Sequence, residues 1–270
     1  MKPGLYPDMS RDDYDKVDAA HYSILKHFHL SAKEARHQEL NRPEPTAAMD
    51  LGNALHTAVW EPDLLNDRYA AAPEVDRRTK VGKATWAAFQ VEHPDHIILR
   101  AQEWESVVAM RDAVRAWPTA RKLIESPGVN EASLFWMQED FFCKARLDRY
   151  CKDDGWPCIV DIKTTSRISV HGFSTQCYEL GYHIQMGFYY SGLDALASAQ
   201  RRYKVIVVEN SAPWDVRVCE PSLRMVELGK KLSNAYLLQY KDCVASGSWP
   251  GIGDGWLDLP EWVYKVWESD

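Results

Sequence analysis

The sequence predicts an α/β fold of the α+β kind, in which helices flank a central mixed β-sheet. In the middle of the chain, short aromatic or β-branched runs alternate with turn signals such as Asp153-Asp154-Gly155. Helical patterns with a repeat of about 3.6 residues precede, interrupt and follow these runs. Apolar residues make up 46% of the 270 residues, a share that supports a buried core between sheet and helices.

Helices dominate the first half of the chain. Ser23 begins an apolar pattern that continues through Phe28 to Ala32 and predicts a first helix. A second helix is expected at Ala47–Trp60, where apolar residues recur at helical spacing. Further expected segments are an exposed loop at 73–80, a helix at 82–92, a short strand at 96–99 and a helix at 101–116.

The predicted sheet begins with three strands in succession. They are expected at Ala132–Gln138, Phe141–Cys151 and Pro157–Lys163, and the turn signals between them predict a meander. The segments expected after it are helices at about 170–179 and 182–199, strands at 203–209 and 214–219, and a helix at 222–246.

We expect a single domain at 21–270 after an irregular N-terminal arm at 1–20, which is polar and contains Pro and Gly. No apolar run approaches the ~20 residues of a membrane helix, and no apolar stretch follows Lys2, so a cytoplasmic protein without a membrane partner is expected. The six cysteines form no CxxC pair and are expected to be small buried hydrophobes. Four tryptophans near the C-terminus cover the core or make subunit contacts: Trp249, Trp256, Trp262 and Trp267.

The net charge of −7 counts against binding of nucleic acid by the whole surface, because such binding relies on Lys and Arg. The net charge does not describe the local electrostatic field, because a protein that binds DNA in a channel needs a basic surface only in that channel. Three basic clusters stand out, and each is expected to be a solvated face: Arg77-Arg78-Thr79-Lys80 with Lys83, Lys144-Ala145-Arg146 with Arg149, and Arg201-Arg202-Tyr203-Lys204.

The sharpest motif is Asp161-Ile162-Lys163, which follows the apolar residues Ile159 and Val160. Residues two apart in a strand project from the same face, so Asp161 and Lys163 lie side by side. A salt-bridged sheet face is the ordinary interpretation of such a triplet alone. The functional interpretation is a carboxylate that binds a divalent cation beside a lysine that orients or activates water.

A second carboxylate favours the functional interpretation. Asp148 lies 13 residues upstream of Asp161, late in the preceding strand, and a turn at Asp153–Gly155 would bring the two onto neighbouring strands. Two carboxylates held close together repel each other, so their burial is costly unless a cation compensates. Hard oxygen ligands suit Mg²⁺ or Mn²⁺.

With these residues the chain resembles the PD-(D/E)XK nucleases, whose signature is met by Asp148 and Asp161-Ile162-Lys163. It is most similar to the RecE-type exonucleases of the RecB-like branch, over roughly residues 20 to 200. The resemblance implies a restriction-endonuclease-like fold. The other segments that carry it are Tyr22–Leu25, Gly52–His56, Asp76–Lys83, Glu131–Trp136 and Gln185–Tyr189.

The resemblance also implies roles for individual residues. Mg²⁺ or Mn²⁺ would be held by His56, Asp148, Asp161 and the backbone carbonyl of Ile162, while Lys163 would orient the attacking water. Glu131 would reach the metal through water or cap the sheet edge. The remaining expected members are Gln185 and Tyr189, which would donate to phosphate or hold Lys163, and Arg77, Arg78 and Lys80, which would contact DNA phosphates.

The function implied is that of a metal-dependent 5′–3′ exonuclease on linear double-stranded DNA. RecE-type enzymes form rings and act in recombination with a single-strand annealing protein. Three alternatives stay open: a PD-(D/E)XK endonuclease or a RecB-like nuclease with an iron–sulfur cluster, a non-catalytic DNA-binding assembly protein, and a metalloenzyme acting on carbohydrate or phosphate. The scattered cysteines disfavour the cluster enzyme, and the full Asp148, Asp161 and Lys163 set disfavours the binding protein.

Overall fold

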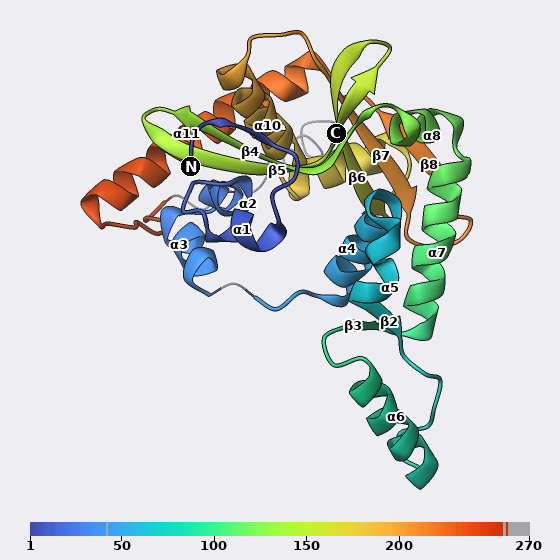
Figure 1. Ribbon diagram of the computed structural model, residues 1–270. Coiled ribbons are helices and arrows are strands. Elements are labelled where there is room, and N and C mark those ends of the chain that lie inside the picture. Colours follow the sequence, from blue (N-terminus) through green and yellow to red (C-terminus); the bar gives the residue numbers. More distant parts are fainter. Residues whose placement is uncertain (42, 256–257, 259–270) are drawn as a thin grey trace, which may run out of the picture.

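A computed structural model describes residues 1–41, 43–255 and 258 of the chain. Its main sheet has six strands in the order β1-β4-β5-β6-β7-β8 (Figure 1). Strands β6 and β7 pair in parallel and all other neighbours pair antiparallel, so the predicted mixed sheet flanked by helices is confirmed. The strands are β1 (Gly4–Tyr6), β4 (Gly128–Gln138), β5 (Phe141–Asp153), β6 (Trp156–Thr165), β7 (Arg202–Glu209) and β8 (Val216–Cys219).

Two tight turns join the three central strands. Glu139 and Asp140 connect β4 to β5 with φ values of 51° and 57°, and Asp154 and Gly155 connect β5 to β6 with φ values of 50° and 84°. Positive φ at both central residues matches the right-handed twist of the flanking strands. The expected meander with its turn at 153–155 is therefore confirmed.

Helices α9 (Val170–Glu179), α10 (Tyr182–Leu196) and α11 (Leu223–Ser246) cover one face of the sheet (Figure 1). Their apolar side chains bury Leu134, Trp136 and Leu147 of the sheet in the larger core cluster. Helices α10 and α11 approach closely because Gly187 and Gly229 lie at their contact.

Helices α4 (Ala47–Trp60), α7 (Ala101–Ala116) and α8 (Pro118–Glu125) pack against the other face. Their core cluster contains Leu55, Met110 and Leu123 from the helices, with Val160 and Ile206 from the sheet. Helix α4 has the predicted bounds, since Thr46 accepts a hydrogen bond from the Met49 N–H and caps its start. Helix α8 was not predicted.

The segment after α4 carries an outlying helix. It continues through η2 (Pro62–Leu64), α5 (Leu65–Arg68) and β2 (Tyr69–Ala71), and β2 pairs in parallel with β3 (Ile97–Leu99). Between these two strands the chain leaves the body and forms α6 (Lys80–Glu92), which stands apart from the main sheet in Figure 1. Gly82 is the only described residue of α6 that is buried.

The prediction of an irregular arm at residues 1–20 is wrong in its detail. Strand β1 extends the sheet by pairing with β4, and Ser10 caps α1 (Arg11–Lys16) by accepting from the Asp13 N–H. The helix expected from Ser23 to Ala32 is divided, because Ser31 starts a new helix with its own cap. The elements of this region are α2 (Tyr22–Leu25), η1 (Lys26–His29) and α3 (Ala32–Leu40).

The remaining chain features concern cysteines, tryptophans and membrane spans. Five cysteines are buried and Cys219 is half-buried, as expected for small hydrophobes. Trp249 packs against Phe28 and Tyr240, whereas Trp256, Trp262 and Trp267 lie outside the described residues. Within the described ranges, every helix is too short or too polar to cross a membrane.

Candidate metal centre

The site forms where three neighbouring strands and helix α4 meet. Asp148 lies on β5 and Asp161 on β6, and the pairing of Arg149 with Val160 sets the two carboxylates beside each other on adjacent strands. Glu131 lies on β4, on the other side of β5. The hairpin predicted from the spacing of the two aspartates therefore forms as expected.

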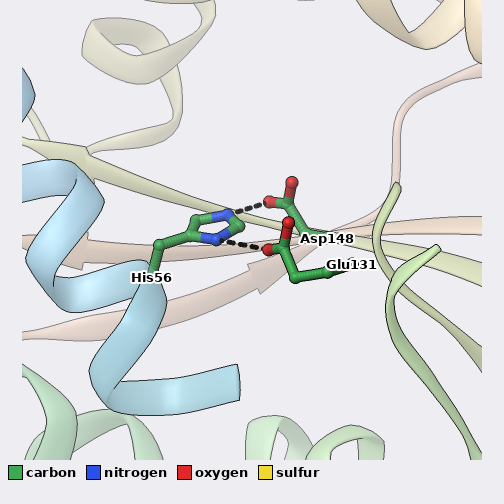
Figure 2. Close-up of side chains that lie close together, drawn as sticks. All are labelled: His56, Glu131 and Asp148. Atoms are coloured by element: carbon green, nitrogen blue, oxygen red, sulfur yellow. Dashed lines mark ion pairs between the residues drawn. The ribbon is translucent and has the colours of Figure 1, made fainter. Parts of the chain in front are cut away.

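His56 of α4 lies between two of these carboxylates, as Figure 2 shows. Its Nδ1 lies 3.1 Å from Glu131 Oε1, and its Nε2 lies 2.5 Å from Asp148 Oδ2. One ligand atom from each of the three residues lies within 4.8 Å of the others. The structure thus joins Glu131 directly to His56 and, through His56, to Asp148, whereas the sequence indicated only a contact with the metal through water or a cap of the sheet edge.

Glu131 adopts a backbone conformation that is unusual for a residue with a side chain. Its φ is 52°, in the left-handed region, while its neighbours Asn130 and Ala132 pair regularly with Arg149 and Leu147 of β5. Such backbone strain in a non-glycine residue is uncommon and tends to occur at functional sites. The local distortion turns the Glu131 carboxylate toward His56.

The charges of this cluster shift the pKa values of its members. Burial lowers the pKa of His56, but the charge of Asp148 and hydrogen bonds to Asp148 and Glu131 outweigh burial and raise it to about 10. Burial raises the pKa of Asp148, but the charge of His56 outweighs it and holds that pKa below its usual range. His56 is therefore positively charged between two carboxylates at neutral pH.

Asp161 is the carboxylate of the site whose charged form is least favourable. Its side chain is completely buried, and its Oδ1 has no hydrogen-bond partner in the described part of the chain. Burial first, and then the charge of Asp148, raise the pKa of Asp161 to about 7. Its other oxygen accepts a hydrogen bond from the Tyr203 hydroxyl at 3.0 Å.

Lys163 stands beside Asp161, as the strand spacing predicted. Its Nζ lies 3.1 Å from Asp161 Oδ2 and 4.9 Å from the centre of the Tyr182 ring. Burial lowers the pKa of Lys163, but the charges of Asp161 and Asp148 outweigh burial and raise it above its usual value. Lys163 is consequently a fixed positive charge at neutral pH rather than a base.

This donor set fits a divalent metal ion. His56, Glu131 and Asp148 converge, the Oδ1 of Asp161 is a buried acceptor without a donor among the described residues, and the single positive charge of His56 faces two carboxylates. Carboxylate oxygens with one imidazole suit a hard or borderline divalent cation. The residues that would hold the ion are thus His56, Glu131 and Asp148, with Asp161 adjoining them.

A cleft of about 1000 Å³ gives access to these side chains. His56, Glu131 and Asp148 line it together with residues 7–12 of the N-terminal segment. Its basic lining residues are Arg11, Arg68, Lys144 and Arg146. The lining also contains the acidic residues Asp8, Asp12, Asp15 and Glu61, and Arg11 and Arg68 form ion pairs with Asp15 and Glu61. The cleft is therefore of mixed charge next to the carboxylates that suit a metal ion.

Helix α10 brings two further predicted residues toward the site. Gln185 and Tyr189 are buried on it, and the Gln185 side-chain amide donates a hydrogen bond of 3.1 Å to the Tyr189 hydroxyl. Tyr189 lines the cleft. The Ile162 N–H donates to Asp148 Oδ2 at 3.1 Å, while the metal-binding role of the Ile162 carbonyl stays a prediction.

The residues predicted to contact DNA do not line the cleft. Arg77, Arg78 and Lys80 belong to the outlying segment around α6. The Arg77 guanidinium lies 3.3 Å from the centre of the Trp86 ring, and Arg78 pairs with Asp76. Their role toward DNA stays a prediction.

Two side chains that touch the site residues were not predicted to do so. Tyr203 supports Asp161, and Arg146 donates to Glu131 Oε2 at 2.9 Å. The expected solvated face at Lys144, Arg146 and Arg149 is wrong, because Lys144 and Arg149 are buried and donate to backbone carbonyls. The proximity of Arg146 to Asp148 in the sequence was the available signal.

Residues 22–255 match a family model described as a PDDEXK-like domain of unknown function, DUF3799. Among solved structures, the chain is similar to a candidate exonuclease from Eubacterium rectale, with a TM-score of 0.63 and 12% identity over 96% of this chain and 98% of that chain. It also matches the structure of SSO0001, with 11% identity over 72% of this chain and 88% of that chain, but the TM-score of 0.30 supports no argument. No curated protein sequence matches it. The first structural likeness shows a shared fold, a six-stranded sheet flanked by helices.

Proposed function

The chain belongs to the PDDEXK-like family DUF3799, and from this premise we propose that it is a metal-dependent deoxyribonuclease that hydrolyses phosphodiester bonds. The supporting observation is the convergence of His56, Glu131 and Asp148 beside the buried pair of Asp161 and Lys163. A carboxylate cluster that lines a cleft, with a lysine beside it, is suited to metal-assisted phosphodiester hydrolysis.

Each residue has a task in this proposal. A divalent cation, Mg²⁺ or Mn²⁺ by the chemistry of the donors, would be held by His56, Glu131 and Asp148 with Asp161 adjoining them. It would supply Lewis acidity toward the phosphate and would lower the pKa of a water. Lys163 keeps its positive charge through Asp161 and stabilises charge that develops on the phosphoryl oxygens. Tyr189 donates to the phosphate from the cleft wall and is oriented by Gln185.

We further propose exonuclease activity in the 5′–3′ direction on linear double-stranded DNA. The RecE-type resemblance supports this direction, and the structural neighbour from Eubacterium rectale is named as a candidate exonuclease. By the same resemblance, copies of the chain assemble into a ring and act with a single-strand annealing protein in recombination. Arg77, Arg78 and Lys80 are proposed to contact the DNA backbone from the segment around α6.

The test is digestion of linear and covalently closed circular duplex DNA, with Mg²⁺ or with EDTA. We expect loss of linear DNA only, with metal only. Lys163→Ala should reduce the rate about 100- to 1,000-fold, the usual effect of removing one group that stabilises transition-state charge. Lys152→Ala is the matched control, because Lys152 lies on β5, is exposed and does not line the cleft.

Other outcomes would redirect the assignment. Cleavage of the circles supports an endonuclease of the same fold. If neither DNA is cut with any divalent metal, the non-catalytic DNA-binding alternative replaces the nuclease. Labelling of either end of the linear DNA gives the direction, and light scattering after gel filtration gives the number of copies in the assembly.

A further inference from the structure

Arg146 connects the metal centre to the N-terminal segment. Its side chain is 13% exposed, and its Nε donates to Glu131 Oε2 at 2.9 Å. One terminal nitrogen of the same guanidinium donates to Ser133 Oγ at 2.9 Å and to the Met9 carbonyl at 3.1 Å. The planar guanidinium can satisfy these acceptors together because its donors point in fixed directions.

The partner of Arg146 in the site is the residue with the strained backbone. Glu131 has a φ of 52°, and its two carboxylate oxygens face different groups, Oε1 toward His56 and Oε2 toward Arg146. Ser133 lies directly opposite Arg146 in the β4–β5 ladder. Arg146 therefore donates hydrogen bonds to two residues of β4, Glu131 and Ser133, one on each side of Ala132.

The N-terminal segment is held from the same strand. Lys144, two residues before Arg146, donates to the carbonyls of Tyr14 at 3.1 Å and Val17 at 2.6 Å, at the end of α1. Lys144, Arg146 and Asp148 alternate along β5, and all three line the cleft. Strand β5 thus carries two cations, Lys144 and Arg146, that hold the N-terminal segment in the cleft wall, followed by the carboxylate of Asp148 in the metal centre.

We propose that Arg146 is a positioning residue that orients Glu131 for metal binding and couples the N-terminal segment to the metal centre. This inference rests on the proposed function. Arg146 occupies Oε2 of Glu131, which leaves Oε1, now facing His56, as the oxygen that would bind the ion. It also offsets one of the carboxylate charges gathered around His56. Groups that orient metal ligands in this way usually change metal affinity 10- to 100-fold when they are removed.

The experiment measures Mn²⁺ binding to the full chain through the EPR signal of free Mn²⁺. Arg146→Gln should raise the Kd for Mn²⁺ at least about tenfold. Arg146→Lys should be intermediate, because one ammonium keeps the charge but cannot reach Glu131, Ser133 and Met9 with the same geometry. Hydrogen exchange of residues 9–17 should become faster in Arg146→Gln, since the segment loses its bond to the Met9 carbonyl.

Arg149→Gln is the matched control for a merely structural role. Arg149 is a buried arginine on the same strand that donates to the Leu123 carbonyl and to the Asn130 side chain, and it does not line the cleft. Its loss should lower the melting temperature and leave the Kd for Mn²⁺ of the folded protein unchanged. Both variants must be folded at the assay temperature, as circular dichroism reports.

The outcomes separate the two proposals. If the wild type binds no Mn²⁺, the metal-dependent function itself fails. If the wild type binds Mn²⁺ and Arg146→Gln binds it equally well, only the positioning role is overturned. Equal loss of affinity in the Arg146 and Arg149 variants would also overturn it, because the effect would then be one of general stability.

Discussion

Asp161→Asn is expected to stabilise the metal-free protein and to abolish its stabilisation by divalent cations. Asp161 is completely buried, its Oδ1 has no hydrogen-bond partner in the described part of the chain, and Asp148 repels it. Asparagine has nearly the same size and no charge. It also supplies a donor where the carboxylate has an unpaired oxygen beside Asp148. The substitution therefore removes a buried charge without opening a cavity.

The size of the stabilisation by Asp161→Asn follows from the pKa of Asp161. The pKa of Asp161 rises from 3.8 to about 7. Each unit corresponds to about 1.4 kcal/mol, so the charged carboxylate costs the native state about 4 kcal/mol at high pH. The attraction between Lys163 and the charged carboxylate at 3.1 Å is already contained in this pKa, so it is not subtracted again. The gain at high pH is therefore at most about 4 kcal/mol, or a melting temperature up to roughly 8 °C higher.

The stability that Asp161→Asn gains over the wild type increases with pH. A group with a raised native pKa contributes stability that is fully present below its unfolded pKa, here near 3.8, and is lost as the pH rises through about 7. Asp161→Asn does not lose this stability at high pH, because asparagine does not ionise. Its advantage over the wild type should accordingly be smaller at pH 5 than at pH 7 and largest at pH 8. The titration of His56 is shared by both proteins, because its partners Glu131 and Asp148 are unchanged.

The assay is thermal unfolding at pH 5, 6, 7 and 8, in EDTA and in Mg²⁺. The wild type should gain about 2.7 kcal/mol at a Mg²⁺ concentration 100 times the Kd, and the variant should gain none. Asp153→Asn is the control, because Asp153 is a buried carboxylate paired with Arg202 away from the cleft and should only lose stability. A lower melting temperature of Asp161→Asn at pH 8 in EDTA would refute the argument from buried charge.

Two further predictions concern the stability of the fold. Glu139→Asn combined with Asp140→Gly should raise the free energy of unfolding by up to about 1 kcal/mol, because both positions have positive φ and Asn-Gly is preferred in such turns; an unchanged or lower denaturant midpoint would contradict this. Gly187→Ala should lower it by about 1–3 kcal/mol, because an added Cβ would lie 2.1 Å from the backbone carbon of Gly229. Gly52→Ala, a helix position with nothing within 4 Å of the added Cβ, should instead gain about 0.5–1 kcal/mol, so equal losses in the two glycine variants would refute the packing argument.

Local patterns explain the parts of the molecule that could be predicted. Helix α4 has its predicted bounds because apolar spacing and the Thr46 cap agree. The hairpin that carries Asp148 and Asp161 also follows from local signals, since strand alternation and the turn at Asp154 and Gly155 fix which residues face each other. In both cases the deciding interactions join residues close in sequence.

The interactions that were missed join residues far apart in sequence. Lys144 was expected in solvent, but the carbonyls at the end of α1 take its hydrogen bonds. Tyr203 reaches Asp161 only because β7 pairs in parallel with β6. Backbone carbonyls are present at every residue, so no pattern of side chains marks those that will bind a buried cation. The left-handed backbone of Glu131 likewise opposes its intrinsic preference.

Proton release on metal binding tests whether His56 is a ligand of the metal ion. His56 is held between Glu131 and Asp148, and its pKa is raised to about 10, so it is protonated at pH 8. A metal ion binds the neutral imidazole, so binding must release this proton, and the affinity should rise with pH below about 10. Titration calorimetry of Mn²⁺ at pH 8 in two buffers of different ionisation enthalpy should report about one proton released, and His56→Asn should abolish it. Equal release by both proteins would mean that another group gives up the proton, and His56 would then lose its assignment as a ligand.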